Sequence, residues 1–313
     1  MASFAYPSQE SFPSLLGEAG EFIAYSEARR STIEEALARY LESERRRPAE
    51  LHDAMRYAVL SGGKRLRPLL CCAAAEIGGK TLEDVLPTAC ALELIHAQSL
   101  VHDDLPAIDD DDIRRGHPTC HVQFGEAVAI LAGDALLARA FEILALQRKT
   151  APPHIVLDVI EVVSHAVGFE GMAAGEVEDI LSENKPGDLA TLEFVHEHKS
   201  GDLIRASLLA GAILGETSTD VRDRLGAYGA AIGLAFQIID DILGEAGDPR
   251  RTGKPVGRDA ERNKLTYPRL VGLQKSREIA ASKAQEALEA LDGMGRAASP
   301  LRALALYVLH RNR

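Results

Sequence analysis

The sequence predicts an all-α protein. Ala, Leu, Glu and Arg are abundant, whereas aromatic residues make up 5% of the chain and Trp is absent. The abundant side chains lose little rotamer freedom in a helix. Apolar residues recur at helical spacing, and no long alternating pattern typical of a strand appears. The chain has 313 residues, 46% of them hydrophobic, which is enough for one large core. We expect a single domain over residues 1–313, with residues 1–30 poorly structured or peripheral.

Capping signals and breaks divide the chain into about ten or more consecutive helices. The first helix is expected to begin at a capping box, in which Ser31 or Thr32 pairs with a glutamate three residues later. The final helix is expected to open at Ser299 and Pro300 and to run to the last residues. Segments rich in Gly, Pro or polar residues mark the breaks between helices at residues 61–68, 106–118, 150–153, 182–187, 215–219 and 244–257.

The charge of the chain, its longest uncharged stretch and its cysteines restrict which partners and which compartment are expected. The chain carries 35 Lys and Arg against 47 Asp and Glu, a net charge of −12, which repels nucleic acid and an anionic membrane surface. The longest uncharged stretch, Leu225–Ile239, is shorter than the roughly 20 residues that cross a bilayer. The four cysteines form no CxxC pair, which favours reduced, buried thiols. We therefore expect a cytoplasmic protein with no nucleic-acid partner and no stable membrane insertion.

A first acidic cluster, residues 103–112, follows a long apolar stretch and is followed by two arginines. A solvated acidic loop is the simplest interpretation of such a run. However, six carboxylates in ten residues repel one another unless cations neutralise them. On a regular helix Asp103 and Asp109 would be about 240° apart, and the turn that Pro106 imposes allows them to converge. Their oxygens would then suit Mg²⁺.

A second acidic cluster, Asp240 and Asp241, ends another long apolar helix. Two such clusters facing each other suit a diphosphate held between metal ions. Cationic residues lie in Gly-rich or Ser-containing segments, namely Lys64, Arg65, Arg67, Lys199, Lys254 and Lys264. No GxxxxGK[ST] or GxGxxG motif occurs, so the sequence does not predict a nucleotide ligand.

The motifs GGKRLRP, LIHAQSLVHDDLPAIDDDDIRRG, HKSG, FQIIDDIL and KLTYP occur in one order along nearly the whole chain. In these motifs the chain resembles the trans-polyprenyl diphosphate synthases, specifically the short-chain farnesyl and geranylgeranyl diphosphate synthases. The resemblance implies an isoprenoid synthase type I helical bundle around a central cavity, assembled as a homodimer. It implies three Mg²⁺ ions in each active site. The implied substrates are isopentenyl diphosphate and an allylic diphosphate with a dimethylallyl, geranyl or farnesyl group.

The resemblance also assigns roles to individual residues. Mg²⁺ ligands, with Asp104 in an orienting role, are expected at Asp103, Asp104, Asp109, Asp240 and Asp241. The allylic diphosphate is expected at Arg114, Lys199 and Lys254, and isopentenyl diphosphate at Lys64, Arg67, His96 and Arg115. The catalytic groups near the carbocation are expected to be Lys199, Ser200 and Gln237. His196 and His198 lie about 200° apart on a helix and are interpreted as structural.

Two residues depart from the family pattern. Gly244 stands where the second motif usually ends in Asp, and we expect activity to survive because Asp240 is the expected ligand. Glu176 stands where the family usually has Gln. The added carboxylate would either weaken diphosphate binding or pair with a cation, and the sequence leaves both outcomes open.

The sequence also bears on product length. Gln98 precedes Asp103 by five residues, about 7.5 Å along a helix, where a growing tail would arrive. In the family an aromatic residue there stops growth near fifteen carbons. Gln98 and the adjacent Ser99 therefore favour twenty. Two other functions share features of this sequence, a type I terpene cyclase and a non-catalytic partner subunit of a prenyl synthase. A cyclase should carry an NDxxSxxxE-type second motif and would not need GGKRLRP.

Overall fold

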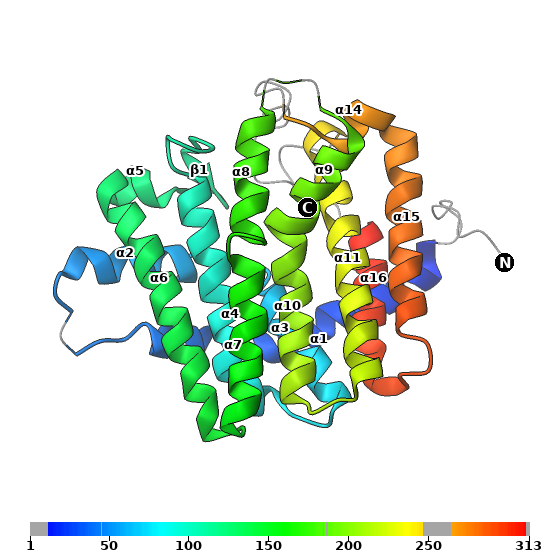
Figure 1. Ribbon diagram of the computed structural model, residues 1–313, viewed down its shortest axis with the longest axis horizontal. Helices are drawn as coiled ribbons and strands as arrows, with labels where there is room; N and C mark the ends of the chain where they lie inside the picture. The colour runs from blue at the N-terminus through cyan, green and yellow to red at the C-terminus, as the bar shows by residue number, and fades with distance from the viewer. Residues whose placement is uncertain (1–11, 45, 184, 186, 247–263, 311–313) are drawn as a thin grey trace.

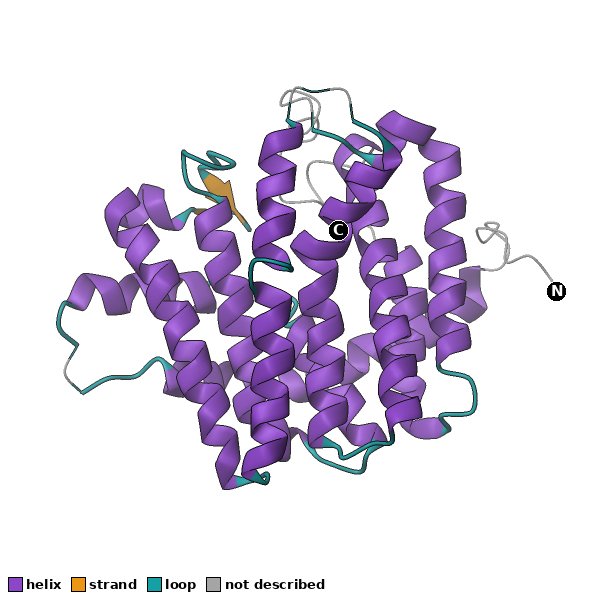
Figure 2. Cartoon of the chain, viewed as in Figure 1, coloured by secondary structure: helices purple, strands orange, loops and turns teal. Residues whose placement is uncertain are grey.

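The computed structural model describes residues 12–44, 46–183, 185, 187–246 and 264–310. Nearly all of the described chain is helical, and a single short hairpin interrupts the helices (Figure 2). The all-α prediction is therefore confirmed. The helices of the first half are α1 (Phe12–Tyr40), α2 (Ala49–Leu60), α3 (Leu66–Ile77), α4 (Leu82–Asp103), α5 (Cys120–Phe124), α6 (Glu126–Leu146) and the 3₁₀ turn η1 (Gln147–Lys149). The hairpin pairs β1 (Ile113–Arg114) with β2 (His117–Pro118).

The second half continues with the same kind of element. Its helices are α7 (Pro153–Val167), α8 (Met172–Ser182), α9 (Leu189–Val195), the π-helical turn η2 (His196–Gly201), α10 (Asp202–Leu214), α11 (Thr219–Ala246), α14 (Tyr267–Val271), α15 (Leu273–Ala290), the 3₁₀ turn η3 (Arg296–Ala298) and α16 (Ser299–His310). The two long helices α4 and α11 both end at the upper side of the bundle in Figure 1. Both acidic clusters consequently lie at one end of the molecule.

Helix α4 is the centre of the bundle and packs against α3, α6 and α10. It has no polar face, because most of its residues are buried, as expected for a helix with neighbours on all sides. Small residues bring its neighbours close together. A Cβ at Gly211 on α10 would lie 2.0 Å from the carbonyl oxygen of Cys71 on α3. The low aromatic content thus reflects tight helix contacts made by Ala and Gly.

The N-terminal helix differs from the sequence prediction. Ser31 and Thr32 lie inside α1, which begins at Phe12 and not at the predicted capping box. The predicted poorly structured or peripheral segment is thus helical from Phe12 onward. Phe22 is 8% exposed and its ring lies 5.4 Å from that of Tyr307 on α16. Tertiary packing of this apolar side therefore extends the helix past a local capping signal.

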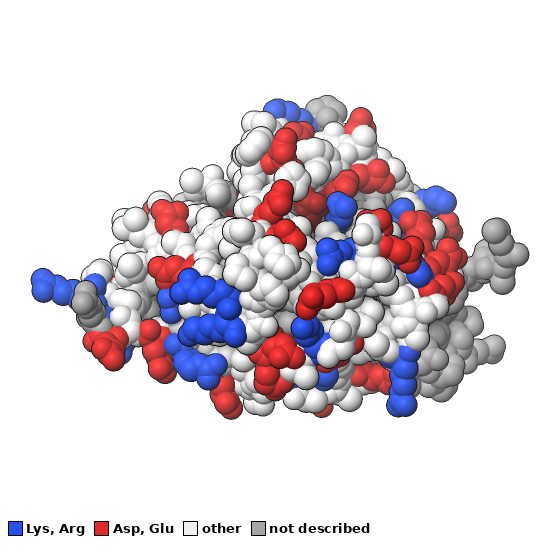
Figure 3. Space-filling model, turned by 60° about the horizontal axis from the view of Figure 1, so that its bottom comes forward, with Lys and Arg blue, Asp and Glu red and all other residues white. Residues whose placement is uncertain are grey.

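One described helix, α11, is long and apolar enough to span a membrane by length and composition alone. In its most apolar window 61% is buried inside the bundle, as in a core helix. Figure 3 shows one face of the molecule, where acidic and basic side chains lie next to one another in several places among uncharged surface.

Candidate active site

The first acidic cluster folds back on itself where α4 ends. The amide of Asp109 donates to the carbonyl oxygen of Asp103 at 2.8 Å, and Asp110 has a φ of 44°. This turn brings the two carboxylates to the same side. Asp103 Oδ1 lies 3.0 Å from Lys199 Nζ, and Asp109 Oδ1 lies 2.7 Å from Lys264 Nζ. Asp103 and Asp109 thus pair with two lysines that are themselves close to one further carboxylate.

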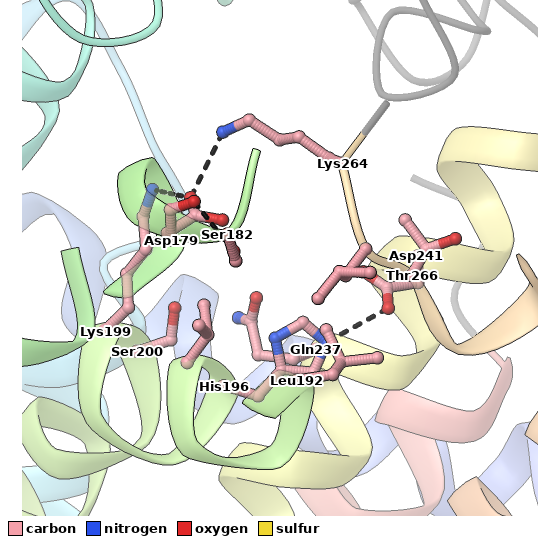
Figure 4. Close-up of a pocket in the computed structure, with 12 residues that line it drawn as sticks. Asp179, Ser182, Leu192, His196, Lys199, Ser200, Gln237, Asp241, Lys264 and Thr266 are labelled. Carbon is pink, nitrogen blue, oxygen red and sulfur yellow. Dashed lines mark hydrogen bonds and ion pairs between the residues drawn. The ribbon is translucent and has the colours of Figure 1, made fainter. Parts of the chain in front are cut away.

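The two lysines share a carboxylate on α8. Asp179 Oδ2 lies 2.7 Å from Lys199 Nζ and 3.1 Å from Lys264 Nζ, as Figure 4 shows. Glu176, one turn earlier on α8, places its Oε1 3.0 Å from Lys199 Nζ. We call these six residues, Asp103, Asp109, Glu176, Asp179, Lys199 and Lys264, the lysine–carboxylate cluster. It joins the first acidic cluster to segments far apart in the sequence.

Asp104 has a different environment from Asp103. It is 3% exposed and accepts hydrogen bonds from Arg114 Nε at 2.7 Å and 2.8 Å, one to each oxygen. The guanidinium also donates to Asp103 at 3.0 Å. Arg114 Nη2 also lies 2.5 Å from Asp104 Oδ1, and charge-assisted pairing of this kind is strong. Arg114 therefore fixes the orientation of both carboxylates from the short hairpin.

Lys199 and Ser200 lie on the π-helical turn η2. Such turns are rare and redirect side chains at functional sites. Helix α8 approaches this turn closely, since a Cβ at Gly175 would lie 2.1 Å from the amide nitrogen of Lys199. Lys199 and Ser200 line a pocket of about 140 Å³, and Gln237 on α11 lines the same pocket. The structure thus brings the three predicted catalytic residues together.

The second acidic cluster lies on the other side of this pocket. Asp241 Oδ2 is 3.0 Å from His196 Nε2 and accepts a hydrogen bond from the amide of Tyr267 at 2.9 Å. The rings of His196 and Tyr267 are stacked, with centroids 5.8 Å apart. Asp240 is exposed. Asp241 is thus held by His196 and by the main chain of Tyr267, and Asp240 is the more exposed of the two residues.

A separate group of cations surrounds His96 on α4. We call Arg65, Arg67, His96 and Arg115 the basic pocket. Arg115 donates to the carbonyl oxygen of Gly62, which ties the hairpin to the GGKRLRP segment. Among the described residues, Arg67 Nε and His96 Nδ1 are buried without a hydrogen-bond partner. Buried polar atoms usually have partners, so these two indicate a place for an anionic ligand.

Buried Glu93 balances part of this positive charge. Its Oε1 lies 3.0 Å from Arg65 NH1, and both side chains are 3% exposed. Burial lowers the pKa of Arg67 to about 10 although Glu93 opposes the shift. Burial, with Arg67 and Arg115, holds the pKa of His96 well below its usual range. His96 is therefore neutral at pH 7 and can donate one hydrogen bond without adding charge.

The charged groups of the lysine–carboxylate cluster shift one another's pKa values. Burial opposes ionisation of Asp103, but Lys199 and Arg114 outweigh it and hold its pKa at about 2. Burial raises the pKa of Glu176 to about 7 although Lys199 opposes the shift. Burial opposes the charge of Lys199, but Asp103 and Asp179 raise its pKa well above the usual value. Both lysines stay charged at neutral pH.

Comparison with known proteins shows to which family the chain belongs. Residues 48–297 match the polyprenyl synthetase family. The chain belongs to this family. A curated relative from Fischerella ambigua (strain UTEX 1903), a dimethylallyltranstransferase, is 46% identical over 92% of this chain and 83% of its own length. A geranylgeranyl diphosphate synthase from Cyanophora paradoxa is 43% identical over 93% of this chain and 96% of its own.

A solved structure has the same fold. The apo crystal structure of an FPP/GFPP synthase from Zymomonas mobilis superposes with a TM-score of 0.82 and 39% sequence identity, covering 93% of this chain and 99% of that one. The predicted isoprenoid synthase fold is therefore confirmed. So is the predicted resemblance to prenyl diphosphate synthases.

The remaining residues to which the sequence analysis of this polyprenyl synthetase gave a role have the following positions. Lys254 lies outside the described residues. Lys64 is exposed next to the basic pocket. Gln98 is buried and its Nε2 lies 3.1 Å from His102 Nδ1, while Ser99 Oγ donates to the carbonyl oxygen of His96 at 3.0 Å. Gly244 lies near the end of α11, one turn after Asp240.

The sequence motifs do not predict two residues of the site. Lys264 occurs only as one of several cations in the predicted breaks, yet it contacts Asp109 and Asp179. Asp179 belongs to none of the motifs, although it lies three residues after Glu176 and so on the same helix face. His196, predicted to be structural, lines the pocket and holds Asp241 in place. The spacing of HEHKSG could have placed His196 near Lys199.

The donor set agrees with a hard divalent cation. In the described part of the chain no three ligand side chains are grouped closely enough to hold a metal directly, because Lys199 and Lys264 lie between the carboxylates. The groups around those lysines are nevertheless all carboxylates, the ligands that Mg²⁺ prefers. The residues present therefore fit Mg²⁺, once the lysines turn towards another anion.

Proposed function

We propose that this polyprenyl synthetase condenses isopentenyl diphosphate with an allylic diphosphate, head to tail, to give an all-trans prenyl diphosphate of fifteen to twenty carbons. The observation that carries this proposal is the presence of two different anion sites at one end of the bundle. The lysine–carboxylate cluster suits a diphosphate with metal. The basic pocket has unpartnered donors and suits a diphosphate without metal. A reaction that joins two diphosphates needs both.

The allylic diphosphate binds at the lysine–carboxylate cluster in this proposal. Its C–O bond breaks, and Lys199, Lys264 and Arg114 stabilise the negative charge that develops on the leaving diphosphate. When bound, Mg²⁺ supplies further positive charge to the same oxygens. Asp103 and Asp109, with Asp240, would hold the metal. Three ions, the number that the family resemblance implies, remain part of the proposal.

The allylic carbocation is attacked by the double bond of isopentenyl diphosphate. Arg67, His96 and Arg115 orient that second substrate from the basic pocket. The new C–C bond leaves a cation that loses a proton to the departed diphosphate, so no side-chain base is needed. Ser200 and Gln237 direct oxygen atoms to the allylic cation, and the apolar lining supplied by Leu192 and Val195 excludes water.

The product is proposed to be geranylgeranyl diphosphate rather than farnesyl diphosphate. Gln98 and Ser99 are small or flexible compared with an aromatic residue, which favours the longer chain. The name of the Cyanophora relative, a geranylgeranyl diphosphate synthase, also supports this length. Dimethylallyl, geranyl and farnesyl diphosphate all remain candidate primers.

We also propose a cytoplasmic homodimer. Exposed apolar side chains occur on the neighbouring helices α6, α7 and α8 and on the turn before α8, namely Leu131, Leu157, Phe169, Val177 and Leu181. These helices adjoin at the front of Figure 1. Apolar surface of this extent favours burial against a second copy. The four free cysteines are buried, which suits a reducing compartment.

The experiment that tests the function supplies purified protein with isopentenyl diphosphate, each allylic primer in turn and Mg²⁺, with and without a chelator. Mass spectrometry then weighs the dephosphorylated products. We expect a discrete Mg²⁺-dependent prenyl alcohol, mainly of twenty carbons. No elongation from any primer would contradict the proposal and favour a partner subunit or a cyclase.

A further inference from the structure

Glu176 has a defined partner. The ammonium of Lys199 has three N–H donors, and three carboxylate oxygens surround it. They are Asp179 Oδ2 at 2.7 Å, Asp103 Oδ1 at 3.0 Å and Glu176 Oε1 at 3.0 Å. In the part of the chain that the structure describes, Glu176 forms no ion pair with any other cation. Both carboxylates on α8 therefore accept a hydrogen bond from Lys199 before any substrate arrives, and Asp103 adds an ion pair.

The same contact changes the charge that a diphosphate meets. Within the lysine–carboxylate cluster four carboxylates face two ammonium groups, whereas a glutamine at position 176 would leave three carboxylates. The carboxylate of Glu176 also makes a charge-assisted hydrogen bond with Lys199, which is stronger than one from a neutral amide oxygen. A diphosphate that binds without metal must therefore displace Glu176 from Lys199. It must also bind next to one additional negative charge.

A divalent cation held by Asp103 and Asp109 would lower both obstacles. Its charge would offset the carboxylates, and a carboxylate that paired with it would leave a donor of Lys199 for the diphosphate. We propose that Glu176 is a positioning residue that increases the dependence of diphosphate binding at this site on a divalent cation. It holds Lys199 among carboxylates until the cation is present. The inference rests on the proposed function, because it concerns the allylic diphosphate site.

Inorganic pyrophosphate is the probe for this inference, and calorimetry measures its binding. All proteins carry Arg67→Gln, so that the basic pocket does not contribute. Glu176→Gln is compared with the parent and with Glu178→Gln, which makes the same charge change two residues along α8, where no ion pair with Lys199 is found. Titrations run at pH 8.5, where Glu176 is ionised, once with a chelator and once with saturating Mg²⁺.

With the chelator, we expect Glu176→Gln to bind pyrophosphate about tenfold more tightly than the parent, a difference of about 1.4 kcal/mol. Glu178→Gln should stay within twofold of the parent. With Mg²⁺, all three proteins should agree within threefold. Equal affinities of parent and Glu176→Gln under chelation would overturn the inference, as would an equal gain in Glu178→Gln. Absence of binding to the parent even with Mg²⁺ would instead overturn the proposed function, and the inference with it.

Discussion

His96 is a neutral side chain in a strongly basic environment. Its pKa is lowered by burial and by Arg67 and Arg115, so the folded protein disfavours its protonation. In the unfolded chain it binds a proton near pH 6.5. Stability from the neutral form is therefore complete above pH 6.5 and is lost as the pH falls below that value.

We expect His96→Gln to remove this pH dependence. Between pH 7.5 and 5.5 the variant should gain about 1.4 kcal/mol of unfolding free energy relative to the wild type. Urea unfolding at the two pH values measures the difference. His165 is exposed, and the control His165→Gln should show no such gain. A constant difference between wild type and His96→Gln would contradict the assignment of His96 as neutral and buried.

Gly244 tests how much of the second motif the reaction needs. We expect Gly244→Asp to change kcat by less than a hundredfold at saturating Mg²⁺, because Asp240 is the proposed ligand and Asp241 is already anchored by His196 and Tyr267. A rise of a hundredfold or more, about 2.7 kcal/mol of barrier, would mean that the native motif is incomplete. Steady-state rates with a Gly244→Asn control separate charge from side-chain size.

Gln98 tests the product-length proposal. It lies on α4 five residues before Asp103 and bonds to His102. We expect Gln98→Tyr to shift the product from twenty carbons towards fifteen, because the ring fills space below the first acidic cluster. Ser99→Ala should not, since its hydroxyl bonds only to the main chain of His96. Mass spectrometry measures the product lengths. An unchanged product spectrum would show that Gln98 does not set product length.

At the scale of elements, the site depends on how closely α8 packs against the turn η2. The sequence predicts well which site residues come together within one helix or turn. Pro106 predicted that Asp103 and Asp109 converge, and the motif HKSG placed Lys199 and Ser200 together. It could not find Asp179 or Lys264, because their contacts arise when α8 and the segment before α14 meet α4 in three dimensions. It also placed the start of α1 too late, since only packing on α16 shows why residues before Ser31 are helical.

Gly175→Ala tests that close approach. The added Cβ would lie 2.1 Å from the amide nitrogen of Lys199, so α8 or η2 must shift. We expect a loss of about 2 kcal/mol in unfolding free energy and a fall in kcat of tenfold or more. Gly20→Ala on α1 is the matched control, because nothing lies within 4 Å of its Cβ. It should stabilise the protein by about 0.5–1 kcal/mol. Similar stabilities for both variants in thermal unfolding would show that the approach is not tight.

At the scale of the whole molecule, the exposed apolar side chains on α6, α7 and α8 predict an interface. Leu131 is 59% exposed near the start of α6. We expect Leu131→Lys to convert a dimer into a monomer in analytical ultracentrifugation without lowering the thermal stability of the monomer. Ile23→Lys on α1, where Ile23 is 47% exposed, should leave the dimer intact. A wild type that sediments as a monomer would contradict the proposal.

The pairing of α1 with α16 bears on the order in which the chain acquires its structure. A ribosome synthesises α1 first among the described helices and α16 last, yet Phe22 packs against Tyr307. Until α16 has been made, the apolar side of α1 has no permanent neighbour there and exposes surface that invites aggregation. The contact also joins residues 285 positions apart (307 − 22), a separation that slows folding. Nascent chains of this enzyme should therefore depend on chaperones more than their helical content suggests.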